Sequence, residues 1–78
     1  MLSDSTLRWR CRRGKKELDV LLGGFLDRNL AHLDPVQRAT FERLLALEDD
    51  DLLDLIFGRS TTSDAAAAAL LDRLGSRA

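Results

Sequence analysis

Few residues of this 78-residue chain have the types and spacing that catalysis requires. Cys11 and His32 are its only cysteine and its only histidine. A nucleophilic cysteine needs a base held within hydrogen-bond reach, and no pattern in the sequence orients His32 toward Cys11. We therefore expect Cys11 in a partly buried core position and His32 on the surface near a helix end. The sequence predicts no catalytic residue and a protein that is not an enzyme.

The acidic run around position 50 is the other group with possible chemistry. Asp49, Asp50 and Asp51 are consecutive, so their side chains point in different directions, and they lack the spacing and the glycine of a calcium-binding loop. A single cysteine also excludes a thiolate zinc site. Acids in this position favour the positive end of a helix, and no metal site is predicted.

The strongest charge feature is a basic run between positions 8 and 16. Its members are Arg8, Arg10, Arg12, Arg13, Lys15 and Lys16. The net charge is only −1, so the composition does not imply a general affinity for polyanions. Trp9 is the single aromatic residue there that could stack on a base, and the apolar face is too narrow for a membrane-surface helix. A small nucleic-acid-binding or antitoxin-like regulator remains the alternative interpretation.

Gly14 interrupts this run, and two interpretations of it stay open on the residues alone. Arg13 and Glu17 are four apart, so in a continuous helix they would form an ordinary ion pair of about 0.3–0.5 kcal/mol. Alternatively, Gly14 turns the chain between two helices or lets a partner backbone approach closely. Arg13, Glu17 and their neighbours would then form a fixed polar patch for another protein, since arginine and tryptophan are enriched in interface hot spots.

The elements that must position these residues are all helices, and we predict a compact all-α bundle of about five short helices. The first helix is expected over about 4–12 with Asp4 or Ser5 as the cap, and the second follows Gly14 and runs to about Ala31. A third helix should start at Pro35 after an Asp34 cap. The last two are expected at 49–58, ended by Gly58, and at 64–75, capped by Ser63 or Asp64. In the second helix a stripe of Leu18, Leu21, Leu22 and Phe25, with Leu26 beside it, should be buried. Gly23-Gly24 should let another helix pack closely, with a hinge as the alternative. The alanine-rich last helix is expected to pack weakly, to be partly mobile, or to contact a partner.

Length and composition predict one helical domain over residues 1–78, with its core in about 7–58 and a final helix at 64–75. No apolar run approaches the roughly 18 residues that span a bilayer, and no signal peptide is recognisable. The single cysteine suits a reducing compartment. We expect a bacterial-type cytoplasmic protein without membrane insertion.

Two blocks of the sequence resemble a known family. "LRWRCRRGKKELD", residues 7–19, resembles the Arg-Gly-x-x-Glu signature of the succinate dehydrogenase FAD assembly factors. "FERLLALEDDDLLDLIFG", residues 41–58, is similar to a second block of that family, which often has tryptophan where this chain has Leu55. The resemblance covers about residues 7–58 and has the correct spacing between blocks.

This resemblance implies a five-helix bundle and a function. Family members bind the flavoprotein subunit of succinate dehydrogenase, and often of fumarate reductase, and promote covalent attachment of FAD to a histidine of that subunit. The chain itself would hold no cofactor stably, and no nucleic-acid partner is expected. The partner-binding residues would be Arg12, Arg13, Gly14 and Glu17, with Arg8, Trp9, Arg10 and Lys16 at the rim.

Overall fold

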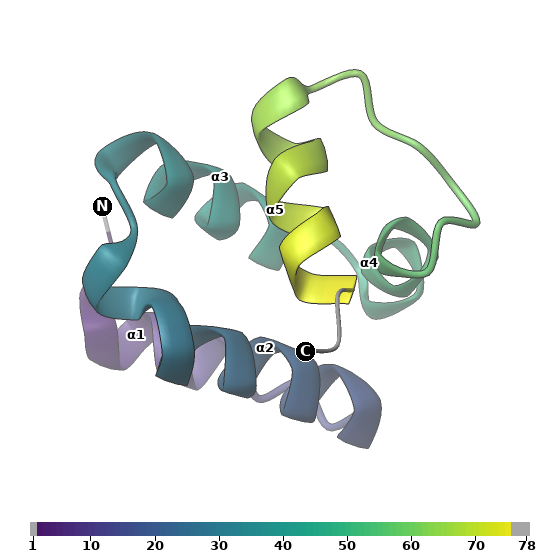
Figure 1. Ribbon diagram of the computed structural model, residues 1–78. Helices are drawn as coiled ribbons and strands as arrows, with labels where there is room; N and C mark the ends of the chain where they lie inside the picture. Colours follow the sequence, from purple (N-terminus) through teal and green to yellow (C-terminus); the bar gives the residue numbers. More distant parts are fainter. Residues whose placement is uncertain (1, 76–78) are drawn as a thin grey trace.

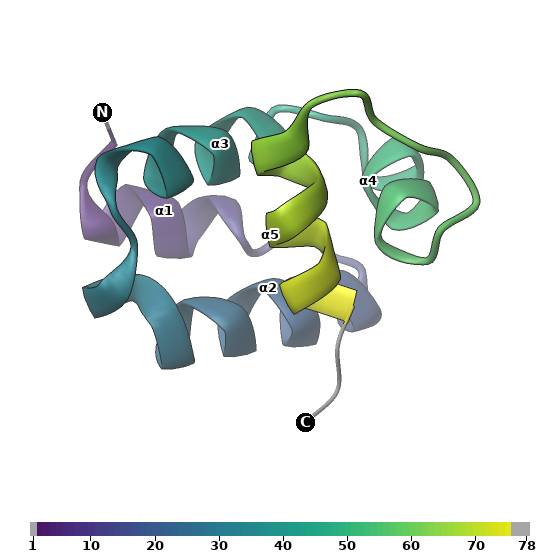
Figure 2. The same ribbon diagram turned by 45° about the horizontal axis from the view of Figure 1, so that its top comes forward.

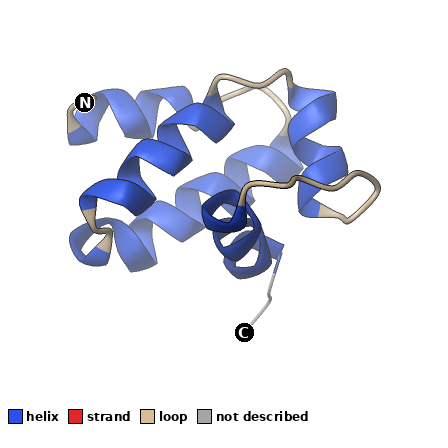
Figure 3. Ribbon diagram, turned by 90° about the horizontal axis from the view of Figure 1, so that it is seen from above, coloured by secondary structure: helices blue, strands red, loops and turns tan. Residues whose placement is uncertain are grey.

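The computed structural model describes residues 2–75, and the predicted all-α class is confirmed. The elements are α1 (Asp4–Arg10), α2 (Lys16–Asn29), the 3₁₀-helix η1 (Leu30–His32), α3 (Pro35–Leu45), α4 (Asp49–Ile56) and α5 (Ala65–Gly75). Within residues 2–75 there is no strand (Figure 3). No helix in that range combines the length and the apolar character that a bilayer crossing requires.

The helix starts follow from side-chain capping. Asp34 accepts a hydrogen bond from the backbone N–H of Gln37, and the Gln37 side chain accepts one from the Asp34 N–H, so the predicted start of α3 is confirmed. Neither predicted cap of α1, Asp4 or Ser5, is the observed one. Ser3 is the cap, because its hydroxyl accepts from the N–H of Thr6.

The ends of α1 and α2 are earlier than predicted. α1 ends at Arg10 instead of residue 12, and the chain turns through Cys11 and the residues that follow it. α2 ends at Asn29, after which the backbone tightens into η1 before extending at Leu33. Tightened last turns of this kind satisfy terminal carbonyl groups that an α-helix leaves without a partner.

α5 crosses the bundle and contacts α2, α3 and α4, while α4 lies to the side (Figures 1 and 2). The expectation that the alanine-rich helix packs weakly is therefore wrong. Its buried side chains are Ala67, Leu70, Leu71 and Leu74. Each fully buried leucine contributes about 1.5–3 kcal/mol, so three leucines outweigh the small side chains of the alanine run. The core thus extends beyond the predicted residues 7–58.

The core is formed by one apolar face from each α-helix. Phe25 of α2 and Phe41 of α3 stack at its centre, with ring centroids 5.4 Å apart. The remaining buried apolar residues are Leu7 and Cys11, then Leu18, Leu22 and Leu26, then Leu44 and Leu45, then Leu52 and Ile56, with the four residues of α5. The predicted stripe of α2 is buried except for Leu21, which is half-buried.

No second helix packs closely against the glycine pair of α2, so that prediction is wrong. A Cβ atom built on Gly23 would have no neighbour within 4 Å. At Gly24 the nearest atom would be a guanidinium nitrogen of Arg28 in the same helix, at 3.2 Å. α2 continues as one helix through both glycines. The space beside Gly23 is open because no other side chain or helix fills it.

Candidate partner-binding surface

The turn between α1 and α2 is built on Gly14. Its φ is +84°, a left-handed conformation that costs other residues about 1–2 kcal/mol. A new helix then begins at Lys16, so Arg13 and Glu17 do not share one helix. The ion pair that a continuous helix would allow is not formed, and the alternative interpretation of Gly14 as a corner is confirmed.

Arg13 faces inward and ties this turn to the segment between α3 and α4. Its Nε donates to Asp49 Oδ1 at 2.5 Å, its Nη1 donates to the Leu45 carbonyl at 2.7 Å, and its Nη2 donates to the Leu47 carbonyl. The backbone N–H of Arg13 donates to Asp19 Oδ1 at 2.7 Å. With its side chain only 13% exposed, Arg13 acts as a positioning residue for the turn.

Sequence reasoning missed the roles of Asp49 and Asp19. The sequence pattern places Asp49 at the positive end of the α4 dipole, but Asp49 also accepts a hydrogen bond from Arg13, which lies 36 positions earlier in the chain. The neighbouring Asp50 pairs with Lys15 at 3.2 Å on the surface. In the sequence, the run of consecutive acids was the only sign of the Asp49 and Asp50 contacts, because an ion pair across the bundle depends on where α4 packs. Within residues 2–75, no group of acidic, histidine and cysteine side chains is arranged to hold a metal.

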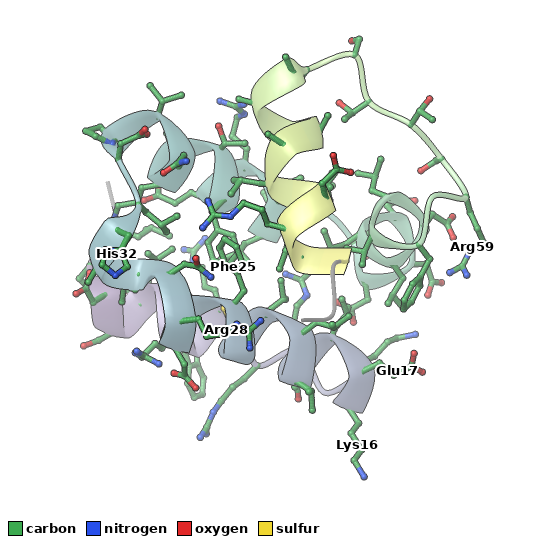
Figure 4. The ribbon with its side chains drawn as sticks, viewed as in Figure 1. Lys16, Glu17, Phe25, Arg28, His32 and Arg59 are labelled. Carbon is green, nitrogen blue, oxygen red and sulfur yellow. The ribbon has the colours of Figure 1, made fainter. Side chains whose placement is uncertain are left out.

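Around the fixed turn, the other predicted residues are exposed. We call the corner surface the set Trp9, Arg10, Arg12, Gly14, Lys16 and Glu17, all of which are exposed. The indole of Trp9 is 70% exposed, although tryptophan is usually buried or held in an interface. Figure 4 shows Lys16 and Glu17 at one end of α2, with His32 at the opposite end. Arg8, the remaining rim residue, pairs with Asp27 at 2.7 Å.

A surface of this kind, with charged groups around an exposed indole, can recognise another protein. Cys11 is 3% exposed, and burial raises the pKa of its thiol to about 11, with nearby Arg13 and Arg8 opposing the rise. Its thiol is therefore a poor nucleophile at neutral pH. The expected surface position of His32 near a helix end is confirmed.

The described chain from residue 5 onward, including the corner surface, lies within a sequence match to one family. A family profile described as "Flavinator of succinate dehydrogenase" (Sdh5) matches residues 5–78. The chain belongs to this family.

Curated relatives extend the same match. The chain is 39% identical over 71 residues to the FAD assembly factor SdhE of Idiomarina loihiensis, covering 91% of this chain and 79% of the relative. It is 42% identical over 65 residues to the SdhE of Xylella fastidiosa strain 9a5c, covering 83% and 67% of the two chains. For the SdhE of Methylococcus capsulatus the identity is 41% over 68 residues, covering 87% and 82%.

One departure from the family pattern lies away from the corner surface. Leu55, where the family often has tryptophan, is a half-buried residue of α4 that packs against the core. The turn that carries Gly14 contacts α4 through Asp49 and Asp50, at the opposite end of that helix. Leu55 therefore lies away from the contacts that hold the Arg-Gly-x-x-Glu turn in place.

Proposed function

We propose that this chain binds the flavoprotein subunit of succinate dehydrogenase, and of the related fumarate reductase, and promotes covalent attachment of FAD to it. Family membership and the shared name of the relatives support this function. FAD is the substrate of the reaction and becomes attached to the partner. The chain acts as an assembly factor, without a catalytic residue or a resident cofactor, in a bacterial-type cytoplasm.

The mechanism is one of orientation. Flavinylation is slow when the partner does not hold its acceptor histidine against the flavin, and binding that stabilises the reactive arrangement increases the rate. The exposed guanidinium of Arg12 would contact carboxylates or carbonyls of the partner. Gly14, which has no side chain, would let the partner backbone approach, and Glu17 would accept a hydrogen bond. Arg13 would act through the turn that it holds in place.

The observation that carries this proposal is an exposed corner surface on a turn fixed from within by Arg13. Half of the basic run is already paired inside the chain, because Arg8, Arg13 and Lys15 each contact a carboxylate. Less positive charge is then available to phosphates than the sequence alone indicates. This pairing favours a protein partner over a nucleic acid.

The test combines the purified flavoprotein subunit, FAD and this chain, and follows covalent flavin by in-gel fluorescence. The proposal predicts faster covalent attachment when the chain is present. Equal rates with and without the chain would contradict it. Retardation of DNA or RNA in a low-salt gel shift would instead support the nucleic-acid alternative.

A further inference from the structure

Beside the corner surface, an open groove of about 590 Å³ runs between α1 and α2. Arg8 and Arg12 line it from the α1 side, and Asp19, Gly23 and Asp27 line it from α2. Gly14 is part of both the groove and the corner surface. Any partner that covers the corner surface therefore approaches this groove as well.

Gly23 is responsible for the open space at the α2 wall. A glycine inside a helix is unfavourable compared with most other residues, and a close contact or an unusual backbone angle commonly explains its presence. Neither applies to Gly23, because a Cβ atom there would have no neighbour within 4 Å and its φ is that of the helix. The room beside Gly23 is available to an atom from outside the chain.

The charged side chains that line the groove differ in whether they already have a partner within the chain. Asp27 accepts a hydrogen bond from Arg8, and Asp19 accepts one from the Arg13 backbone. Arg12 is exposed and has no ion-pair partner within residues 2–75. Arg12 is therefore the cation of the groove that no carboxylate of residues 2–75 neutralises, whereas Asp27 is paired with Arg8 and Asp19 keeps its negative charge.

We propose that this groove receives an extended acidic segment of the flavoprotein subunit, with its backbone against Gly23 and a carboxylate on Arg12. The inference rests on the proposed function, because the occupant is part of that partner. It extends the contact from the corner surface along α2. Charge-assisted pairing to arginine supplies the recognition, and the missing side chain of Gly23 supplies the room.

The shape of the groove is tested by a matched pair, Gly23→Gln and Gly24→Gln. Both replace a glycine of the same helix by a better helix former, so both variants should stay folded, as urea unfolding will verify. Gly24 lies outside the groove, beside the flexible Arg28 side chain. In titrations with the purified flavoprotein subunit, we expect Gly23→Gln to weaken binding about tenfold and Gly24→Gln by less than about twofold.

Equal affinities for Gly23→Gln and the wild type would overturn the inference while leaving the proposed function intact. A wild-type chain that does not bind the subunit at all would remove both. These two failures are distinguished in the same experiment. If Gly24→Gln weakened binding as much as Gly23→Gln, the effect would belong to α2 in general, and the groove assignment would be wrong.

The acidic character of the occupant is tested by comparing Gly23→Glu with Gly23→Gln, which differ only in charge. At low salt we expect the Glu variant to bind about threefold more weakly than the Gln variant, with the difference disappearing at high salt. Equal or stronger binding by the Glu variant would overturn the acidic assignment. Binding of FAD by the isolated chain, lost in Arg12→Gln, would assign the groove to the cofactor and contradict a protein occupant.

Discussion

Arg13 and Glu17 stand four residues apart in one motif but do different work. The Arg13 guanidinium donates hydrogen bonds to Asp49 and to two backbone carbonyl groups, while the Glu17 side chain is exposed. A motif of this kind combines one residue that fixes the backbone with others that face a partner. Substitutions of the two should therefore fail in different ways, one through structure and the other through binding.

The Arg13 network makes Asp49 important for stability. Asp49→Ala would leave a mostly buried guanidinium without its carboxylate, and we expect the free energy of unfolding to fall by about 2 kcal/mol. Asp50→Ala is the matched control, since its exposed pair with Lys15 is worth less than about 1 kcal/mol. Urea unfolding of both variants measures the difference. Equal losses would show that the Asp49 contact has no special weight.

Two glycines of the chain should respond to alanine with opposite signs. Gly14→Ala forces a side chain into a positive φ and should cost about 1–2 kcal/mol of stability. Gly23→Ala adds a methyl group in open space within a helix and should stabilise the chain by about 0.5–1 kcal/mol. Urea midpoints of the two variants test this contrast. A stabilised Gly14→Ala variant would mean that the turn does not need its left-handed backbone.

The elements differ in how much of them the sequence could predict. Asp34 and Pro35 mark the start of α3 through local chemistry alone, so that boundary was predicted correctly. The packing of α5 was not predicted correctly, because the expectation was based on the small side chains of the alanine run, whereas Leu70 and Leu74 are buried in the core. The corner surface could be predicted from residue types. The inward direction of Arg13 could not, since it depends on the docking of α4.

α5 is fixed at its start by Asp64, the second of the two predicted caps. Its carboxylate accepts from the N–H groups of Ala66 and Ala67 and pairs with Arg43 at 2.6 Å. The Ala67 hydrogen bond is the largest cause that lowers the pKa of this carboxyl, with smaller contributions from Ala66 and Arg43, while burial opposes them. The ionised form of Asp64 therefore stabilises the folded state.

This shift sets the sign of a pH dependence. Because the folded-state pKa of Asp64 lies below its unfolded value, its contribution is complete above about pH 4 and is lost as the pH falls through the folded pKa. Asp64→Asn keeps a capping oxygen but cannot titrate, so its advantage over Asp64→Ala should not depend on pH. Unfolding curves between about pH 2 and 6 measure this. A wild-type stability that tracks Asp64→Asn at every pH would contradict the assignment.

At the scale of the whole molecule, the bundle presents one corner of two helices to its surroundings. The Arg13–Asp49 ion pair holds that corner, and α5 contacts α2, α3 and α4 to close the core. A small chain organised in this way can bias the arrangement of a much larger partner without contributing chemistry of its own. Substitutions of the exposed side chains of the corner surface should therefore change the rate of flavinylation while leaving the stability of the bundle unchanged.

The most direct measurement is a time course of covalent flavin on the purified flavoprotein subunit with wild type, Glu17→Ala and Asp72→Ala. Glu17 and Asp72 are both exposed acids, but Asp72 lies on α5, outside the corner surface. We expect Asp72→Ala to match the wild type and Glu17→Ala to slow attachment about tenfold while its urea midpoint stays unchanged. Wild-type rates from a folded Glu17→Ala variant would contradict it.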